Sequence, residues 1–474
     1  MVVAPGVNSV PTHSAAATRW GRRIVIGLSV AVFGPYLAPG LRTEQVAVYG
    51  AAALLCLGGL WMRPRFTGTA VWALGAHLSL VAVATIGVVL PPQNYTLYEA
   101  GDVVAGFDNI VLPLVVVAVV AMLVGAGADP ARMLRAVCTV TVLAMAANAL
   151  MAVSSAAGVE SDLLARFRLF GEGESVADRA EQLGRYSGIF NQPAEAGVLY
   201  SVAVLAALYV YQRQVGKLAV VLLLLSVGGV LSVSKIFLLV GAPIAIAYVI
   251  LASGRRRRLS AAAAASIGAW FTADAYLDQW DGQRFAMRLL PGSGGDDQLG
   301  LYTAGRVGGQ SSLQQAVDVM TALSPASGMG FGGLRVAYDN GWVEALVVAG
   351  VIGVVLHTAV LAALAVGWLR TRNHRPESAF TGALILMLIG ASTGVPALTA
   401  NRCATIVWLL LGLLLLVRAD GRPGTWWQRP GRGQHRHRPA LAPTLVPAAV
   451  LAPVVRPSGV RPAGVRPAGV RPTR

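Results

Sequence analysis

The chain has 474 residues, of which 55% are hydrophobic and 13% charged, and its mean hydropathy is +0.62. Soluble globular proteins carry about 25% charged residues, so this composition excludes an ordinary soluble protein and indicates a polytopic membrane protein. The formal net charge of +16 would suggest nucleic-acid binding in a soluble protein, but most Arg residues lie in short loops and the C-terminal tail. Membrane topology and anionic lipid explain that placement, so we expect membrane lipid and no nucleic acid as partners.

A helix that crosses a membrane needs about 20 mostly apolar residues, and the chain contains about twelve such stretches. They lie near residues 24–39, 45–62, 69–90, 110–127, 135–157, 196–212, 217–233, 236–253, 260–276, 341–369, 378–398 and 402–418. The tenth is overlong, and we expect Gly350 and Gly353 to break or tilt it. The sequence therefore predicts an all-α, polytopic membrane domain over residues 24–418, with a large outer loop before the tenth span.

The Arg and Lys residues predict the orientation of these spans. If residues 1–23 form a cytoplasmic N-terminal segment, most of the basic loops also lie in the cytoplasm. Residues 91–109, which contain acidic residues and no basic residue, then lie outside. This agrees with the positive-inside rule and puts both termini of this cell-membrane protein in the cytoplasm. Two long segments, 158–195 and 277–340, become outer loops, and such long polar loops usually bind or catalyse.

Three further segments have a distinct composition. Residues 163–170 predict an amphipathic helix at the membrane interface. The second outer loop is rich in Gly, notably at residues 328–333. Residues 419–474 are rich in Arg, His and Pro and end in five-residue repeats such as Val460-Arg-Pro-Ala-Gly464. We expect this last segment to be a disordered basic cytoplasmic tail near anionic lipid.

The sequence contains little that points to a metal or a cofactor. Cys56, Cys138 and Cys403 all lie in apolar stretches and have no metal-ligand spacing. No P-loop, dinucleotide-binding glycine motif or His-Glu-x-x-His is present in the sequence. We therefore expect no metal and no cofactor, and chemistry at the outer face would need an activated donor.

Several basic residues oppose the positive-inside bias because they lie at outer span mouths or in outer loops. They are Arg185, Lys235, Arg306, Arg335 and Arg402. The planar guanidinium of Arg suits bidentate contact with phosphate oxygens, and Lys adds a point charge. Such a cluster fits a lipid-linked diphosphate. The alternative is that each residue pairs with a nearby carboxylate or extends to lipid headgroups.

Three carboxylates flank spans on the predicted outer side and are candidate general bases. Asp339 and Glu344 lie at the start of the tenth span, and Glu195 lies at the start of the sixth. A carboxylate beside an apolar wall can accept a proton near neutral pH. Glu195 has an alternative role, as an ion-pair partner of Arg185. His357 lies deep in the tenth span, where we expect it to pack against or hydrogen-bond to a neighbouring helix.

Three pieces of sequence form an ordered set of motifs. The first is Arg185-Tyr-Ser-Gly-Ile-Phe-Asn-Gln-Pro193, and the second is Val233-Ser-Lys235, two spans later. The third consists of Thr303-Ala-Gly-Arg306, Pro325-Ala-Ser-Gly-Met-Gly-Phe-Gly332, Asp339-Asn-Gly-Trp-Val-Glu-Ala-Leu346 and Gly350-Val-Ile-Gly353. In this order, and with the large outer loop before the tenth span, they resemble the O-antigen ligase and polymerase superfamily of integral membrane glycosyltransferases.

The resemblance covers about residues 24–418 and implies an activity. It implies metal-independent transfer of a glycan from an undecaprenyl-diphosphate carrier to an acceptor glycan, with inversion at the anomeric carbon, at the outer face of the cytoplasmic membrane. Arg185, Lys235 and Arg306 would hold the diphosphate. Asp339 would take the place of the base, which is a His in the ligases, and this departure favours a polymerase that joins repeat units.

The complete predicted site contains residues in three roles. Asp339, Arg185 and Glu344 are the expected catalytic residues; Arg335 and Arg402 are further diphosphate ligands; and Glu195, Ser234 and Asn340 support them. Polysaccharide-assembly proteins are candidate partners. The main alternative function is a transporter or flippase of lipid-linked sugars, which would also bind a diphosphate with Arg residues, and another is a non-catalytic scaffold for polysaccharide assembly.

Overall fold

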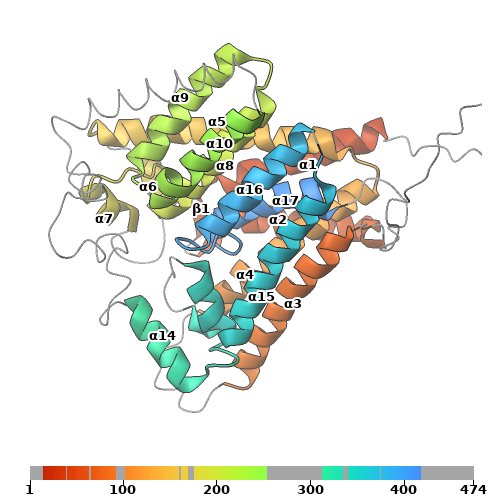
Figure 1. Ribbon diagram of the computed structural model, residues 1–474, viewed down its shortest axis with the longest axis vertical. Coiled ribbons are helices and arrows are strands. Elements are labelled where there is room, and N and C mark those ends of the chain that lie inside the picture. The colour runs from red at the N-terminus through yellow and green to blue at the C-terminus, as the bar shows by residue number, and fades with distance from the viewer. Residues whose placement is uncertain are drawn as a thin grey trace, which may run out of the picture. The chain divides into compact units, whose positions relative to one another are not determined.

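The structure is a computed structural model that describes residues 14–38, 40–62, 64, 66–91, 102–159, 162–168, 176–252, 312–334, 340–373 and 375–417. Of these residues, 79% are helical. They all belong to one compact unit, Met1–Gly424 (Figure 1). A second unit, Thr425–Arg474, lies outside the described residues, so the disordered basic tail stays a prediction.

Five helices are long and apolar enough to cross a membrane. They are α3 (Gly68–Val89), α4 (Val103–Gly125), α5 (Pro130–Ala156), α8 (Pro193–Val210) and α15 (Gly341–Thr371). The shorter apolar helices are α2 (Thr43–Leu57), α9 (Val215–Leu231), η3 (Ile236–Gly241) with α10 (Ala242–Ala252), α16 (Pro376–Ala391), and α17 (Asn401–Leu411) with η5 (Gly412–Leu416). The chain is therefore a helical membrane protein. The total of about twelve spans stays a prediction, and the ninth, 260–276, lies outside the described residues.

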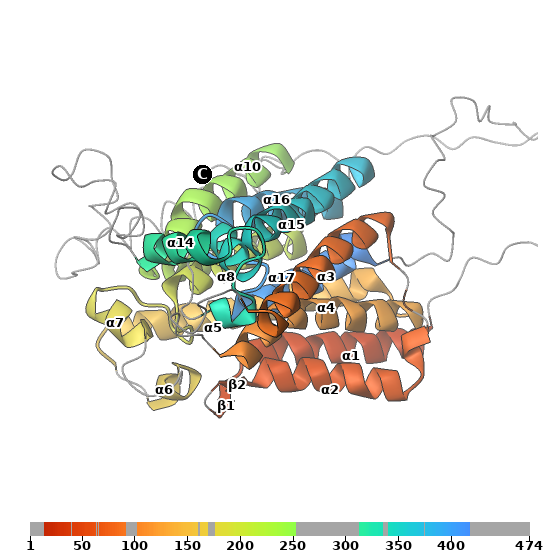
Figure 2. The same cartoon turned by 90° about the horizontal axis from the view of Figure 1, so that it is seen from below.

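The first two helices differ from the prediction in where they begin and end. Helix α1 is Ala15–Val32 rather than 24–39, because Ser14 caps it by accepting from Ala17 N and because Pro35 disfavours helix at Gly34. Two short antiparallel strands follow, β1 (Tyr36–Ala38) and β2 (Leu41–Arg42). Figure 2 shows α1 and α2 side by side, with both strands at one end of the pair.

Shorter elements occupy parts of the predicted outer loops. They are α6 (Asp162–Arg168), α7 (Val176–Gln182), α14 (Ser312–Leu323) and the one-turn helix η4 (Phe331–Gly333), and a further turn, η1 (Leu60–Met62), follows α2. Helix α6 lies where the sequence predicts an amphipathic helix, so that element is confirmed as a helix. The segment 158–195 is thus partly helical.

Helix α8 is the innermost of the long helices. In its most apolar stretch 89% of the residues are buried, against 28% for α3. A helix that is apolar on every side is buried when other helices surround it, and α8 packs against α5, α9 and α16. Helix α8 directly follows the loop of residues 185–192. The first predicted motif therefore lies at the start of the most buried long helix.

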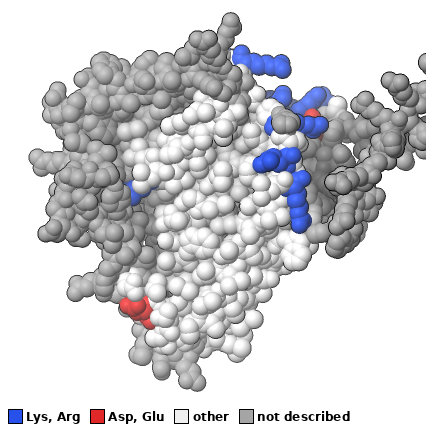
Figure 3. All heavy atoms as spheres, viewed as in Figure 1, with Lys and Arg blue, Asp and Glu red and all other residues white. Residues whose placement is uncertain are grey.

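The helices have one strongly basic end. The exposed cationic residues there are Arg19, Arg22, Arg23, Arg132, Arg135, Arg213, Lys217, Arg370, Arg372 and Arg375. Contacts between helix ends bring them together: Asp129 N donates to Thr18 Oγ1 (3.2 Å), and Tyr209 Oη donates to Glu377 Oε1 (3.1 Å). Figure 3 shows Lys and Arg side chains gathered on the side of the molecule where α1 begins and α15 ends. We call this the basic end.

The opposite end of the helices contains the predicted site residues that the structure describes. There Thr43 Oγ1 donates to Ala31 O (2.7 Å), which joins α2 to the last turn of α1. Gly341 N donates to Ser392 O (2.8 Å), which joins the start of α15 to the end of α16. We call this the site end.

Candidate functional site

Arg402, in the first turn of α17, connects three parts of the chain at the site end. Its Nη1 donates to Ile189 O (3.0 Å), and its Nη2 donates to Gly34 O (3.1 Å) and Phe167 O (3.2 Å). The residue is 3% exposed, and a buried guanidinium needs such acceptors because an unpaired buried charge is very unfavourable. Arg402 therefore ties the end of α1, the end of α6 and the loop before α8 together.

Two aromatic rings surround the Arg402 guanidinium. Its Cζ lies 5.4 Å from the ring centroid of Tyr36 and 5.7 Å from that of Phe190, and such cation–π contacts strengthen when water is excluded. The Tyr36 hydroxyl accepts a hydrogen bond from Asn191 Nδ2 (3.4 Å). Burial raises the pKa of Tyr36 above its usual value, against the opposing effect of Arg402, so the hydroxyl stays neutral.

Glu195 lies beneath the start of α17. It is 5% exposed, and its carboxylate lies close to the backbone N–H groups of Arg402 and Cys403. Ala400, the residue that precedes α17, has no side chain able to cap the helix, so a carboxylate from α8 stabilises its positive N-terminus instead. The cations that act most strongly on Glu195 are Arg402 and Arg42. One carboxylate oxygen, Oε1, is buried without a hydrogen bond.

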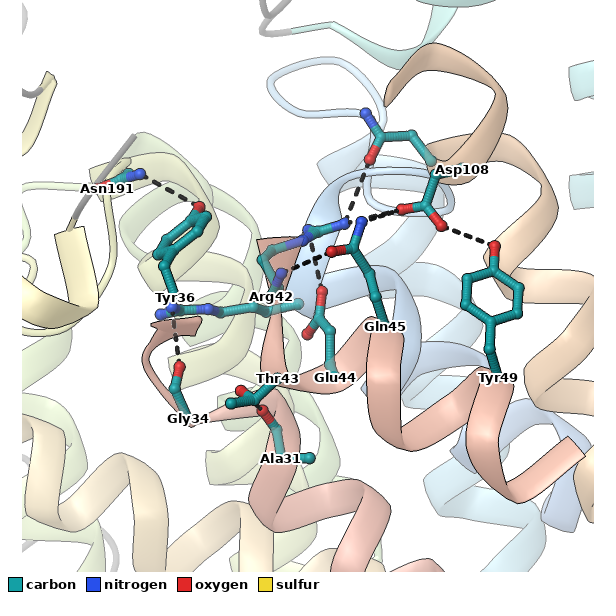
Figure 4. Close-up of polar contacts among 12 residues, drawn as sticks. Ala31, Gly34, Tyr36, Arg42, Thr43, Glu44, Gln45, Tyr49, Asp108 and Asn191 are labelled. Carbon is teal, nitrogen blue, oxygen red and sulfur yellow. Dashed lines mark hydrogen bonds and ion pairs between the residues drawn. The ribbon is translucent and has the colours of Figure 1, made fainter. Parts of the chain in front are cut away.

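A second buried network is centred on Arg42 (Figure 4). Arg42 Nη1 lies 2.9 Å from Glu44 Oε1, and Nη2 lies 3.3 Å from Asp108 Oδ2. The Asp108 carboxylate also accepts from Gln45 Nε2 and from Tyr49 Oη (2.7 Å). Burial alone would lower the pKa of Arg42, but Glu44, Tyr36 and Asp108 hold it above its ordinary value. Arg42 is therefore a permanent cation between two carboxylates that come from α2 and α4.

This network lies outside the set of site residues predicted from the sequence. Arg42 stands between the first two predicted spans on the predicted outer side, so the argument that singled out Arg185 applies to it equally. Asp108 was assigned to an outer loop and α4 was expected to begin near residue 110. The helix begins at Val103 instead, because Asp102 Oδ1 accepts from Val104 N and Ala105 N.

The turn after α9 has an unusual backbone. Val233, which is 1% exposed, has φ +44°, and it is the only non-glycine residue with positive φ among those described. A β-branched residue is strained in this region, and such strain concentrates at functional sites. The next two residues are Ser234, which is buried, and Lys235, which is half-buried, and the π-helical turn η3 follows.

This turn packs against the first motif and the start of α8. Tyr186 N donates to Leu231 O (2.9 Å), so the residue after Arg185 is bonded to the end of α9. A Cβ on Gly197 would lie 1.9 Å from Ser234 Oγ, so only glycine permits this approach of α8 to the turn. Two motifs that lie about two spans apart in sequence therefore meet at the site end.

Helix α15 is broken, as the sequence predicts. Ala349 (φ −138°) and Gly350 (φ +63°) are not helical, and the chain folds back there. The rings of Trp342 and His357 consequently lie 4.9 Å apart, and a Cβ on Gly353 would lie 2.1 Å from Ala345 O. Residues 341–348 thus form a short arm that packs against the longer arm of the same helix.

The glycine-rich part of the third motif holds this break in place. Met329 N donates to Val347 O (2.7 Å), and Val351 N donates to Pro325 O (2.9 Å). A Cβ on Gly328, whose φ is +69°, would lie 2.5 Å from Ala349 N. The glycines therefore serve close backbone packing around the turn of α15.

The short arm of α15 carries two predicted site residues. Asn340 caps it, because its Oδ1 accepts from Trp342 N (2.9 Å), and its Nδ2 donates to Thr393 O (3.2 Å). Glu344 accepts a hydrogen bond from Thr399 Oγ1, in the segment that leads into α17. Asn340 and Glu344 are therefore held next to the approach to Arg402.

The described site residues all occur at one end of the helices. These are Arg185, Glu195, Ser234, Lys235, Asn340, Glu344 and Arg402. The other three, Arg306, Arg335 and Asp339, lie outside the described residues. Arg402 uses its Nη groups on backbone carbonyls, and its role as a diphosphate ligand stays a prediction.

The histidines of the spans serve packing. His357 packs edge-on against Trp342 in the short arm of its own helix, whereas the prediction placed its partner in a neighbouring helix. His77 Nε2 lies 2.7 Å from Ile110 O, and its ring packs against Trp408 with centroids 5.4 Å apart. Over the part of the chain that the structure describes, no group of three or more His, Cys, Asp or Glu residues could hold a metal ion.

Comparison with known proteins adds no assignment: the chain matches no protein-family model and no curated protein. The resemblance described above therefore rests on the motifs themselves.

Proposed function

We propose that this protein is a glycan polymerase or ligase. It transfers an oligosaccharide from an undecaprenyl-diphosphate carrier to an acceptor glycan at the outer face of the cytoplasmic membrane. The observation that carries the proposal is that motifs distant in sequence meet at the site end. The loop that contains Arg185 is bonded to the end of α9 beside Lys235, and the arm that contains Glu344 is bonded to the segment before Arg402.

The orientation follows from the charges of the two ends. The basic end faces the cytoplasm, in accord with the positive-inside rule, and the site end faces outward. Both termini are then cytoplasmic, and about twelve spans complete the membrane domain. Arg306, Arg335 and Asp339, which lie outside the described residues, would complete the site.

Positive charge at the site end would stabilise the leaving group. Arg185, Lys235 and Arg306 bind the donor's diphosphate and neutralise the charge that develops on it, as fixed donors do most effectively where water is excluded. Arg335 and Arg402 extend this field. Because these side chains supply the positive charge, the reaction needs no metal.

A carboxylate at the start of α15 would accept the proton. The acceptor hydroxyl attacks the anomeric carbon while the bond from that carbon to the diphosphate oxygen breaks, and its proton passes to Asp339 or Glu344. The diphosphate leaves with the bonding electron pair. Glu195 and Asn340 support this arrangement by stabilising the starts of α17 and α15, and Ser234 packs against Gly197 near the start of α8.

A transporter of lipid-linked sugars is a second candidate, and the break in α15 is the feature that favours it. Interrupted helices at a binding site are common in secondary transporters. The same lipid diphosphate would then bind at the site end, but no glycosidic bond would form. The two functions differ in where lipid-linked intermediates accumulate.

The decisive experiment has two parts: lipid-linked glycans are measured in a deletion strain, and glycan transfer is measured with purified protein. We expect polymer to be lost and single repeat units to accumulate on the carrier at the outer leaflet. Purified full-length protein in liposomes should extend a lipid-diphosphate-linked repeat unit in the presence of a metal chelator. Units trapped on the inner leaflet, with no extension in liposomes, would refute the enzyme and support the transporter.

A further inference from the structure

Asn148 is a buried amide in the middle of a membrane-crossing helix. It lies in α5, is 1% exposed, and makes no hydrogen bond along its own helix in the described contacts. A polar side chain inside a span is unfavourable unless it is fully bonded, and such residues usually have a specific role. Its hydrogen bonds therefore indicate what that role is.

All three partners of the Asn148 amide lie in the first motif or in the helix that follows it. Nδ2 donates to Ser187 O (3.2 Å) and to Tyr200 Oη (2.9 Å), and Oδ1 accepts from Ile189 N (2.8 Å). Gly188 lies between the two bonded backbone groups with φ +64°, and a Cβ there would lie 2.2 Å from Asn148 Oδ1. The Asn148 amide thus packs directly against this one turn and is hydrogen-bonded to its backbone.

Other buried groups bind the same turn from different sides. Arg168 Nε donates to Gly188 O (2.8 Å), and Arg168 is itself held by Glu181 Oε1 (2.5 Å). Ser187 Oγ donates to Phe190 O (2.7 Å). With Arg402 on Ile189 O, the turn that directly follows Arg185 is fixed by side chains from α5, from α6 and from α17.

We infer that Asn148 is a positioning residue that holds residues 187–190 and thereby sets where Arg185 is presented at the site end. The inference rests on the proposed function in one respect, because the ligand that Arg185 would meet is the donor's diphosphate. Asn148 itself does not touch substrate. Its effect passes through the backbone of the turn to the Arg185 side chain.

The first test follows the motion of residue 185 and needs no activity. A spin label is attached to Arg185→Cys in full-length protein, with Cys56→Ser because Cys56 is exposed. We expect Asn148→Leu to increase the mobility of the label clearly. Thr141→Val is the matched control, since Thr141 is a buried polar residue of α5 that bonds only Val137 O of its own helix, and it should leave the mobility unchanged.

A second variant covers the case in which Asn148→Leu does not fold. Asn148→Ser stays neutral and polar, but its shorter side chain cannot reach all three partners, so an intermediate mobility is expected. Unchanged mobility of the label in the folded Asn148 variants would overturn the inference. Equal mobilisation by Thr141→Val would overturn it as well, because the effect would then be general loosening of α5.

The second test is a double-mutant cycle on glycan transfer. Misplacing a catalytic group by about 1 Å can lower a rate about 10²-fold, so Asn148→Leu should lower kcat/KM for the lipid-diphosphate donor by at least about tenfold, chiefly through kcat, because Arg185 acts on charge that develops in the transition state. Adding Arg185→Ala should then cause little further loss, whereas Arg185→Ala with Thr141→Val should be additive. Additive losses of kcat/KM for Asn148→Leu and Arg185→Ala would refute the inference that Asn148 acts through Arg185. If the wild-type protein transfers no glycan, the proposed function fails, and the spin label still decides the role of Asn148.

Discussion

The two ends of the helices contain charged residues in very different settings. At the basic end the cations are exposed, as in the Arg132–Asp129 pair, where the atoms lie 3.3 Å apart and the Arg132 side chain is 72% exposed. At the site end Arg42 and Arg402 are at most 5% exposed and each bonds several acceptors. Exposed cations suffice to orient a membrane protein, whereas buried ones must be bonded to be tolerated.

This difference indicates that the cations of the basic end serve membrane topology, whereas those of the site end serve the structure of the candidate site. Moving an Arg from one position to another at the basic end should have little effect on orientation, because only the total positive charge matters there. The site end depends on particular atoms. Substitutions at the two ends should therefore differ greatly in effect.

The largest effect is expected for the general base. General-base catalysis contributes about 10²–10⁴-fold, so either Asp339→Asn or Glu344→Gln should lower the rate of transfer by that factor. Glu344→Gln can keep the hydrogen bond with Thr399, so its protein level should not fall. Transfer is measured with purified protein and a lipid-diphosphate donor. Full activity in both variants would show that neither carboxylate is the base.

Removal of Arg42 should destabilise the fold strongly. Arg42→Met leaves Glu44 and Asp108 buried without their cation, which costs about 3–5 kcal/mol of unfolding free energy. The exposed Arg132→Ala should change it by less than about 1 kcal/mol. Thermal unfolding in detergent compares the two.

A rescue variant checks the cause of the Arg42 effect. Arg42→Met combined with Glu44→Leu removes one of the unpaired carboxylates and should recover part of the lost stability. If Arg42→Met and Arg132→Ala have equal effects, the contrast between buried and exposed cations does not hold.

Arg185→Ala should reduce transfer by about 10²–10³-fold, as expected when one fixed donor to a developing charge is removed. The matched variant is Arg213→Ala at the basic end, which should retain wild-type transfer. The membrane levels of both proteins are measured alongside, so that loss of transfer can be separated from loss of protein. Comparable losses in both would mean that the effect is on insertion and that Arg185 has no special role.

The positions of most helices could be predicted from hydropathy, because an apolar stretch of spanning length has few alternatives. Hydropathy does not predict where a helix starts when a capping side chain determines the start. Ser14 and Asp102 each cap a helix that begins before its apolar stretch. The break in α15 was predictable, since its glycines are visible in an overlong span.

The site was only partly predictable. Arg185, Lys235 and Arg402 could be found because each opposes the charge bias along the sequence. The Arg42 network and the Asn148 contacts depend on pairs far apart in the chain, such as Arg42 with Asp108, which no local pattern reveals. The closeness of Glu195 to the start of α17 also depends on segments far apart in the chain, and its supporting role stays a prediction.

The smallest effect on stability is expected for Val233→Gly. Loss of this buried side chain costs about 1.5–3 kcal/mol, but relief of its strained backbone returns about 1–3 kcal/mol, so the net change should be close to zero. The control is Val116→Gly in α4, where an equally buried Val is helical and nothing offsets the loss. Thermal unfolding in detergent should separate the two variants clearly.

Activity then tells what the strain at Val233 is for. If Val233→Gly keeps its stability but lowers transfer, the strained turn serves to fix Lys235 against the donor, since glycine allows the turn several conformations. Equal destabilisation by Val233→Gly and Val116→Gly would mean that the positive φ carries no strain. The turn would then be ordinary packing, and the contrast between the two ends would rest on the buried charges alone.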